Sequence, residues 1–199
     1  SPPWLVIAVP LPGGQPPVQD GFSAGCHHRP MIRVLFPALI ALVLALPAHA
    51  AEVTIARSNP EQVARRVLEL VNQARSEGRR CGRESFPPAA PLASAAPLDA
   101  AASAHARDMA SREYFAHRGK DGREPRDRVR AAGYTARLTG ENIAFGPESA
   151  EEVVAGWLKS AGHCANLMDA RFRHMGIGFA TGRQAGHTYW VQTLGAPGA

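Results

Sequence analysis

Hydrophobic residues recur along this chain first with a helical period and, near its end, with an alternating, strand-like period. The apolar positions and the breakers that flank them predict four helices, over residues 60–78, 98–113, 125–132 and 149–162. Two strands follow, Met175–Ala180 and Thr188–Thr193, joined by a hairpin loop over residues 182–186. Helices followed by strands predict an α+β domain, with helices packed on a small antiparallel sheet.

Capping residues mark the start of two of these helices. Asn59 and Pro60 suit the first helix, because an Asn side chain accepts a hydrogen bond from the first turn and Pro lacks the N–H that would be unpaired there. Ser149, followed three residues later by Glu152, forms a capping-box pattern ahead of the fourth helix. The Ala- and Pro-rich stretch between the first two helices predicts a loop.

The segment from Met31 to Ala50 has the layout of a secretory signal peptide. Arg33 precedes an apolar run over residues 34–46, and residues 48–50 match the small-x-small cleavage pattern. The run is shorter than the ~18–20 apolar residues that cross a bilayer, which disfavours the alternative of a membrane anchor. We therefore predict a secreted protein, periplasmic or extracellular, that does not span a membrane once the signal is removed.

The signal peptide also sets the expected domain boundaries. Residues 1–30 have neither a helical nor a strand period, and we interpret them as upstream sequence or a disordered extension without a domain of its own. Residues 51–59 then form a linker, and residues 60–199 form one domain, long enough for a sizeable core. We expect this domain to be a monomer.

The charge of the chain is positive, with 22 Lys and Arg residues against 17 Asp and Glu residues and a formal net charge of +5. The arginines are scattered over several segments rather than gathered into a stripe with aromatic residues. This distribution disfavours nucleic-acid binding, so no nucleic-acid partner is expected.

Two cysteines, Cys81 and Cys164, follow the signal peptide, whereas Cys26 precedes it. An even pair in an exported chain predicts a disulfide between them. The alternative is a nucleophilic Cys164 beside His163, but an oxidising compartment and an available partner favour the disulfide.

Three polar signatures in the second half of the chain suggest a functional site. They carry two histidines and a glutamate, His117, Glu141 and His163, each in or beside a Gly-containing bend. The signatures are Tyr114–Gly119, Gly140–Ala144 and Trp157–Asn166. Brought together by the fold, these side chains would form a polar cleft.

Structural roles are the alternative for several polar or aromatic residues. His105 lies on the apolar stripe of the second helix and is interpreted as a buried histidine bonded to a neighbour. Trp157 is interpreted as core and Asn142 as an amide that ties down a bend. Glu141 could cap the turn after it, and His163 could end the fourth helix. The arginines of the third helix are interpreted as its solvated face: Arg126, Arg128 and Arg130.

Six short motifs occur in a recognisable order. They are Asn72-x-x-Arg75, His105-Ala106-x-Asp108-Met109-Ala110, Tyr114-Phe115-Ala116-His117, Gly140-Glu141-Asn142-Ile143-Ala144, Trp157 before Ser160-Ala161-Gly162-His163, and Tyr189-Trp190-x-Gln192. Together they resemble the CAP superfamily of cysteine-rich secretory, venom-antigen and plant pathogenesis-related proteins, also called the SCP domain. The resemblance covers nearly all of residues 60–195 and is nearest to the secreted bacterial branch.

The resemblance implies a three-layer α-β-α sandwich around a short antiparallel sheet, with an open cleft. In eukaryotic members, two histidines and two acidic residues line that cleft and can hold a divalent cation. His117 matches the first histidine and Glu141 the first glutamate, whereas His163 stands in the Gly-His of the bacterial members. The second eukaryotic histidine and the second acidic residue have no assigned counterpart, so the four-residue site is half matched.

The candidate chemistry is metal or ligand binding at His117, Glu141 and His163. Two histidines and a carboxylate with open positions are a known zinc arrangement, so zinc is the candidate cofactor. The three residues lie far apart in the sequence, without a short histidine pair on one helix, which favours weak metal affinity. Ser160 near His163 could serve as a nucleophile, but it lacks the strained Gly-x-Ser-x-Gly turn, and we assign no catalytic residue.

We therefore expect a secreted, disulfide-closed CAP-domain protein that binds a ligand or a divalent cation in a cleft lined by His and Glu. One alternative is a metal-assisted hydrolase acting on peptide or cell-envelope material. Another is a lipid or sterol carrier, which the family also includes. The ligand is not identified by the sequence, and a lipid or a cell-envelope component is among the candidates.

Overall fold

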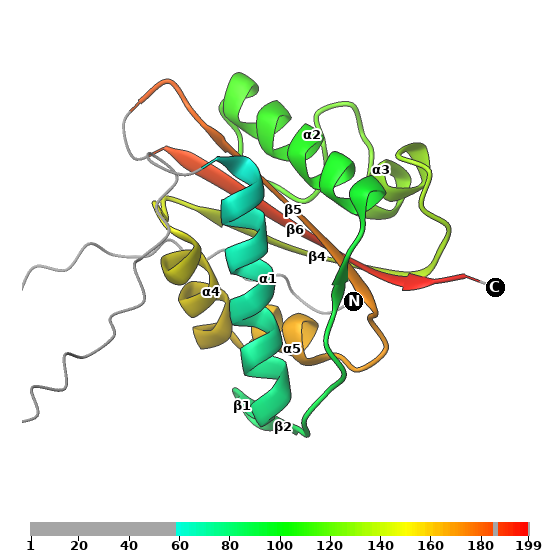
Figure 1. Cartoon of the computed structure of the whole chain (residues 1–199). Helices are drawn as coiled ribbons and strands as arrows, with labels where there is room; N and C mark the ends of the chain where they lie inside the picture. Colours follow the sequence, from blue (N-terminus) through cyan, green and yellow to red (C-terminus); the bar gives the residue numbers. More distant parts are fainter. Residues whose placement is uncertain (1–58, 185–186, 199) are drawn as a thin grey trace, which may run out of the picture. The chain divides into compact units, whose positions relative to one another are not determined.

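A computed structural model describes residues 59–184 and 187–198. The segment 1–30, the expected signal peptide 31–50 and residues 51–58 lie outside the described residues. In the described part, a four-stranded sheet lies between two layers of helices, which confirms the α+β class and the α-β-α sandwich (Figure 1). No helix of this part is long and apolar enough to cross a bilayer.

The sheet is mixed rather than purely antiparallel. The helices are α1 (Pro60–Glu77), α2 (Ala96–Arg112), α3 (Pro125–Ala131), α4 (Ala150–Lys159) and α5 (Ala161–Met168). The strands are β1 (Arg79–Cys81), β2 (Glu84–Phe86), β3 (Ala93–Ser94), β4 (Ala136–Phe145), β5 (His174–Thr181) and β6 (Thr188–Pro197). The sheet has the order β3-β5-β6-β4, in which β6 is antiparallel to both neighbours and the short β3 is parallel to β5. β1 and β2 form a separate antiparallel hairpin.

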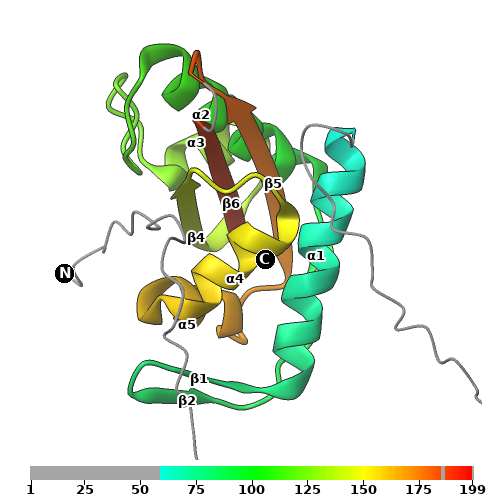
Figure 2. The ribbon, with the colours of Figure 1, turned by 90° about the vertical axis from the view of Figure 1, so that its left-hand side faces the viewer.

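Each face of the sheet buries its own apolar cluster. α1, α4 and α5 cover one face, while α2 and α3 cover the other (Figure 1, Figure 2). On β6, Trp190 and Leu194 pack with Trp157 of α4, whereas Val191 packs with Met109 of α2. This alternation is the two-residue period of a strand that is buried on both faces.

The predicted N-caps of α1 and α4 are confirmed; the full capping box forms at α1, whereas at α4 the Glu152 side chain accepts from the N–H of Glu148. Oδ1 of Asn59 accepts a hydrogen bond from the backbone N–H of Gln62 at 2.8 Å, and the side chain of Gln62 accepts one from the N–H of Asn59 at 3.2 Å. At α4, Oγ of Ser149 accepts from the N–H of Glu152 at 3.1 Å. These bonds satisfy N–H groups that have no partner within their own helix.

Four features differ from the sequence prediction. Gly140–Ala144, expected as a bend, lies inside β4 and pairs with β6 along its whole length. The fourth helix ends at Lys159 instead of residue 162, because Ser160 is extended (φ −90°, ψ 123°). A further helix, α5, then begins at Ala161. The expected loop between α1 and α2 contains the hairpin β1–β2 and the short strand β3.

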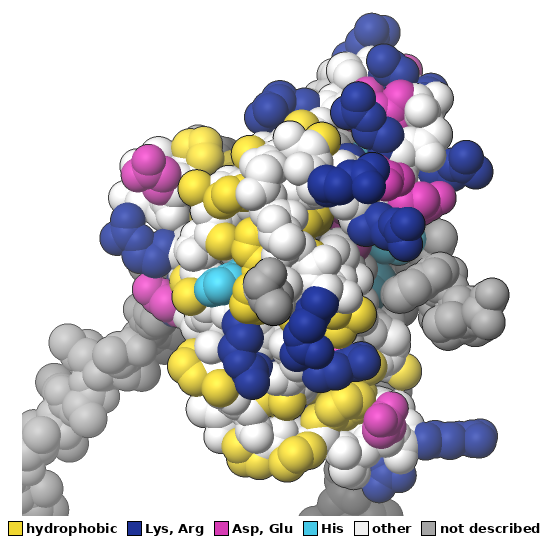
Figure 3. All heavy atoms as spheres, turned by 90° about the vertical axis from the view of Figure 1, so that its right-hand side faces the viewer, with side chains coloured by type: hydrophobic (Ala, Val, Ile, Leu, Met, Phe, Trp, Pro, Cys, Tyr) yellow, Lys and Arg dark blue, Asp and Glu magenta, His cyan; other side chains and the backbone are white. Residues whose placement is uncertain are grey.

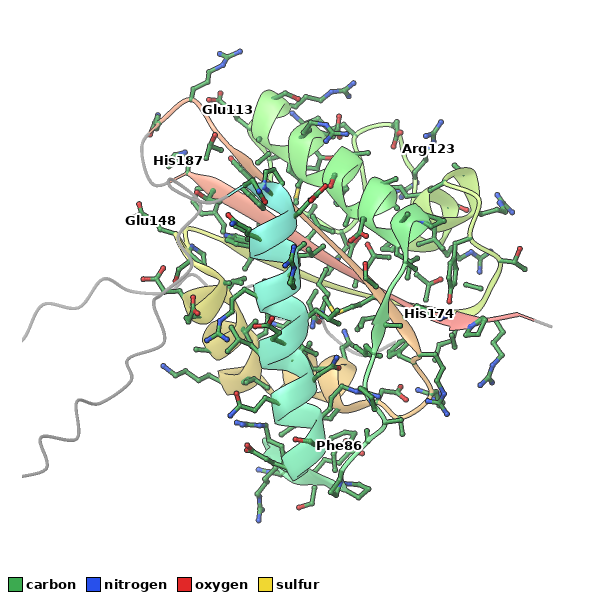
Figure 4. All side chains as sticks on the ribbon, in the orientation of Figure 1. Phe86, Glu113, Arg123, Glu148, His174 and His187 are labelled. Carbon is green, nitrogen blue, oxygen red and sulfur yellow. A yellow bond between two sulfur atoms is a disulfide. The ribbon has the colours of Figure 1, made fainter. Side chains whose placement is uncertain are left out.

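The predicted disulfide joins Cys81 of β1 to Cys164 of α5, with their Cα atoms 5.5 Å apart. Both cysteines are buried against Met168 of α5, and Phe86 of β2 packs beside them. Figure 4 labels Phe86 at the end of the molecule that carries this hairpin. The cross-link therefore fixes the hairpin to α5, the helix that also carries His163.

Residues of the first motif hold the segment between β2 and β3 against α1. The side chain of Asn72 donates to the carbonyl of Leu92 at 3.0 Å and accepts from the N–H of Leu92 at 2.8 Å. Arg75 is fully buried and donates to the carbonyls of Ala90 and Leu167. Both side chains satisfy backbone groups that lie outside regular ladders, which is a structural role.

Candidate functional site along strand β4

β4 is an edge strand of the sheet, and residues of both helical layers contact it. Successive strand residues point to opposite faces. Accordingly, the Glu141 side chain accepts a hydrogen bond from Arg128 of α3 on one face. On the other face, the Asn142 side chain donates to the backbone carbonyl of His163 of α5. Glu141 and Asn142, neighbours in one motif, thus bond to two different helical layers of the sandwich.

The carboxylate of Glu141 is buried, and both of its oxygens are bonded. Its side chain is 2% exposed; Oε1 lies 2.8 Å from Nδ1 of His117, and Oε2 accepts from Nη2 of Arg128 at 2.7 Å. The Arg128 guanidinium also donates to the carbonyls of His117 at 2.9 Å and of Arg123 at 3.0 Å. Arg123 lies in the loop before α3 (Figure 4). One guanidinium therefore fixes both the carboxylate and the backbone of the histidine that the carboxylate orients.

The interpretation of Arg128 as part of a solvated helix face is wrong, because its side chain is only 9% exposed. Arg126 and Arg130, in contrast, are both exposed, as expected. Residues two apart on a helix do not share a face, so three arginines at every second position cannot all point to solvent. That spacing is the sequence signal that could have identified Arg128.

His163 reaches the same edge of the sheet from the opposite layer. It lies in the first turn of α5, and its carbonyl accepts from Nδ2 of Asn142 at 3.2 Å. Burial, and secondarily the positive charge of His117, lower the pKa of His163 to about 4. His163 is therefore a neutral imidazole at neutral pH, and no hydrogen bond within the described part of the chain involves its ring.

Asn142 anchors a buried amide network beside the site. Its Nδ2 donates to Oε1 of Gln192 at 3.0 Å, and its Oδ1 accepts from Nδ2 of Asn166 at 2.9 Å. Nδ2 of Asn166 also lies 3.3 Å from the carbonyl of Glu141. Asn142 thus ties α5 to the two neighbouring strands β4 and β6 rather than tying down a bend.

Two further residues are structural, as expected from the sequence. His105 is 2% exposed, and its Nε2 lies 2.9 Å from the carbonyl of Ala116. Trp157 is 1% exposed and donates its indole N–H to the carbonyl of Ile143 at 3.3 Å. Both side chains pair their buried polar atoms, as buried polar groups generally do.

A hollow of about 220 Å³ opens in front of His117 and Glu141. Its other walls come from the start of α3 and from β4, with Glu124, Pro125, Arg126, Thr139 and Gly140. The side chain of His117 is 24% exposed, against 2% for Glu141, so a ligand would meet the imidazole first. His163 is not among the residues that line this hollow.

The donor set does not fit a zinc ion held by His117, Glu141 and His163. Zinc sites in proteins use three or four protein ligands. The residues that the structure describes contain no group of three or more His, Cys, Asp or Glu side chains placed to hold a metal. Glu141 already bonds His117 through one oxygen and Arg128 through the other.

The sandwich, the disulfide and the polar edge of β4 together define a CAP domain. The chain belongs to the cysteine-rich secretory protein family (CAP), whose family pattern matches residues 68–194. It is 31% identical over 152 residues to the uncharacterized protein YkwD of Bacillus subtilis (strain 168), covering 75% of this chain and 54% of YkwD. An uncharacterized membrane protein of the same organism, YlbC, is 33% identical over 82 residues, covering 41% of this chain and 24% of YlbC. The chain thus spans about half, or less, of the length of these curated relatives.

Solved structures share the fold. An extracellular protein containing a SCP domain from Bacillus anthracis aligns with a TM-score of 0.57 and 23% identity, covering 69% of this chain and 44% of that chain. A cysteine-rich secretory protein from Staphylococcus aureus, SAV1118, aligns with a TM-score of 0.52 and 18% identity, covering 70% and 40%. A structure of NaASP2 with Zn²⁺ aligns with a TM-score of only 0.48 and 18% identity, covering 69% and 81%, and its zinc is a property of that protein.

Proposed function

We propose that this protein is an exported CAP module that binds a small ligand at the imidazole of His117, in the hollow beside β4. The observation that carries the proposal is the buried carboxylate of Glu141, held between His117 and Arg128. The carboxylate accepts the Nδ1 proton of His117 and so fixes the tautomer and the orientation of the ring. An oriented, partly exposed imidazole beside a hollow is suited to binding.

The energetic cost of this arrangement supports a binding role. Burying a carboxylate costs several kcal/mol unless it is paired, and a buried ion pair is often no more stable than apolar residues of similar volume. The side chains of Arg128 and Glu141 are 9% and 2% exposed and bond each other at 2.7 Å. A polar pair that adds little to stability, yet positions a neighbouring side chain, is better explained by a functional site than by the core.

Export is supported by three observations. The pattern of residues 31–50 is that of a signal peptide. The disulfide between Cys81 and Cys164 requires an oxidising compartment to persist. The solved relative from Bacillus anthracis is an extracellular protein.

A divalent cation is the second candidate; since the three-residue set does not fit zinc, His117 and His163 would be its only protein ligands. It is favoured by the neutral state of His163, since the neutral imidazole is the form that ligates a metal. With only two protein ligands, the affinity would be weak. Calorimetry with zinc chloride tests this candidate: saturable one-site binding that is lost in His117→Ala would make the cation the ligand.

Hydrolase and lipid-carrier roles have less support. Ser160 is 4% exposed, and its hydroxyl forms no hydrogen bond with His163 in the described part of the chain. A hollow of about 300 Å³ has the apolar residues Leu68, Met175 and Ile177 among its lining residues. It stands at the lower limit of small-ligand pockets, and Glu61 and Arg65 are also among its lining residues.

The proposal is tested by a fragment screen with ligand-detected NMR on the purified exported protein. We expect a set of fragments that bind the parent, no longer bind His117→Ala, and bind Arg128→Met more weakly because Glu141 loses its partner. His187→Ala, a change at a histidine beside the β5–β6 hairpin, is the matched control and should keep the same fragments (Figure 4). Fragments that bind the parent and His117→Ala equally would refute the site.

A further inference from the structure

A second and larger hollow adjoins the one at His117. Its volume is about 530 Å³, and its walls are α3, the start of β4 and the segment between them. Arg126 and Thr139 line both hollows, so the two adjoin and share part of their wall. The hollow at His117 alone, about 220 Å³, is below the ~300–1,000 Å³ of typical small-molecule sites, whereas the second lies within that range. A ligand of ordinary size would therefore extend from His117 into the second hollow.

The second hollow carries an excess of positive charge. Three arginines line it, Arg126, Arg130 and Arg137, against one carboxylate, Asp127. Oδ2 of Asp127 accepts from the N–H of Glu124 at 3.1 Å, and Oδ1 lies 3.5 Å from Nη2 of Arg130. Asp127 is thus shared between the start of α3 and one of the three arginines.

Two of the three arginines remain uncompensated. Arg126 and Arg137 form no ion pair within the part of the chain that the structure describes. Glu141 and Glu124, which line the adjoining hollow, pair with other arginines: Glu141 with Arg128 at 2.7 Å, and Glu124 with Arg118 at 3.6 Å. Figure 3 shows the side of the molecule toward which α3 lies in Figure 1, and this side carries several Lys and Arg side chains with Asp and Glu side chains among them.

Hydroxyl groups and a fixed aromatic ring complete the lining. Thr135, Thr139 and Tyr134, which carry hydroxyl groups, are among the lining residues. Oη of Tyr134 is hydrogen-bonded to Nδ1 of His174 at 2.7 Å, and Figure 4 labels His174 at the start of β5. The ring of Tyr134 lies against Gly195, where a Cβ atom would come within 2.7 Å of it. The ring is therefore held in place by contacts on two sides.

We propose that the second hollow, here called the arginine groove and lined by Arg126, Arg130, Arg137, Thr135 and Thr139, binds the phosphate group of a phosphorylated ligand. Guanidinium groups bind phosphate through paired N–H donors, and hydroxyls add further hydrogen bonds. A neutral polar part of the same ligand then reaches His117, a step that rests on the function proposed above. The inference gives that ligand a chemical class: an anion that carries phosphate.

The test uses ¹⁵N NMR of the purified exported protein, titrated with inorganic phosphate and then pyrophosphate at low ionic strength. We expect saturable shifts at Arg126, Arg137 and Thr139, with an affinity that falls as salt is added. Arg126→Gln/Arg137→Gln should weaken pyrophosphate binding about tenfold or more, since charge-assisted hydrogen bonds are lost. The matched control, Arg65→Gln/Arg107→Gln, removes the same charge from two exposed arginines outside the groove and should leave affinity within about twofold.

The alternative outcomes are distinguishable. Equal weakening in the two double variants, or shifts that do not saturate, would overturn the groove and leave only a general effect of net charge. His117→Ala should still bind pyrophosphate, so loss of the fragment response with pyrophosphate binding intact would remove the function proposed above and keep the groove. Sedimentation with phosphatidylglycerol vesicles, compared with phosphatidylcholine vesicles, shows whether the phosphate group belongs to a lipid headgroup or to a soluble ligand. Retention by phosphatidylglycerol alone indicates a lipid headgroup, and retention by neither, with pyrophosphate bound, indicates a soluble phosphorylated ligand.

Discussion

At the scale of single residues, the site is organised by charges that are buried in pairs. Arg128 neutralises Glu141 and donates to the carbonyl of His117. Arg128, Glu141 and His117 therefore form one hydrogen-bonded unit. His163 is not part of that unit. Its pKa is lowered first by burial and then by electrostatic interaction with His117, so its imidazole is neutral at neutral pH. The two imidazoles near β4 therefore have different roles, one oriented by a carboxylate and one desolvated.

The depressed pKa of His163 predicts how stability depends on pH. Its folded-state pKa, about 4, lies below the ordinary value near 6.5, so between these pH values the unfolded chain binds a proton that the folded protein does not. Stability should therefore fall as pH drops from about 6.5 to 4, with His163 contributing up to about one proton to the slope. Urea unfolding at stepped pH measures this slope, which should flatten in His163→Gln. Burial also lowers the pKa of His105, so part of the slope should remain in His163→Gln. A slope in His163→Gln equal to that of the parent would contradict the prediction.

At the scale of elements, the position of α2 depends on two glycines in β5. A Cβ atom at Gly176 would overlap the backbone of Leu98, and one at Gly178 would overlap the backbone of Ser103. Glycine in a strand interior often marks such a close approach of another backbone. Asp99 of α2 adds a direct link, because its Oδ1 accepts from the N–H of Ile177 at 2.9 Å. The close approach of α2 to the sheet follows from the absence of two side chains.

Gly178→Ala should therefore destabilise the protein by about 3 kcal/mol or more, since the obstacle is backbone that cannot rotate away. Gly156→Ala is the matched control: Gly156 lies inside α4, and a methyl group added there would have no neighbour within 4 Å, so the change should raise stability by about 0.5–1 kcal/mol. Thermal and urea unfolding of both variants gives the comparison. Equal effects of the two changes would refute the close approach of α2.

At the scale of the whole molecule, the disulfide links the hairpin after α1 to a helix far along the chain. Cys81 and Cys164 are separated by 83 positions, and α5 lies between the hairpin and β4. Closing a loop of this size limits the unfolded ensemble, which contributes about 4 kcal/mol in the chain-entropy model. The same bond restrains the helix that holds His163 at the edge of the sheet.

Cys81→Ser/Cys164→Ser should thus lower the free energy of unfolding by about 2–4 kcal/mol, measured by urea denaturation of the exported protein. Reducing agent should destabilise the parent to a similar degree and leave the double variant unchanged. Alkylation of Cys164 in the untreated native protein would contradict the disulfide.

Some of the fold and part of the site could be predicted because they depend on local patterns. The period of Val63, Val67 and Val71 predicts α1, and an even pair of cysteines in an exported chain predicts the disulfide. The sequence does not predict β4 as a strand because its centre is polar: Glu141 and Asn142 face opposite layers and break the apolar alternation. It does not predict α5 for a similar reason, since Gly162 resembles a helix end.

The sequence by itself determined the helices with a clear period, the last hairpin, the disulfide and, through the order of six motifs, the family. Only the tertiary structure decided that Arg128 turns inward to Glu141, that His117 and Arg128 each engage one carboxylate oxygen, and that Arg126 lines two adjoining hollows. The physical reason is that helical and strand periods depend on neighbours within a few residues. Charge pairing and hollows depend instead on distances between segments that packing alone brings together.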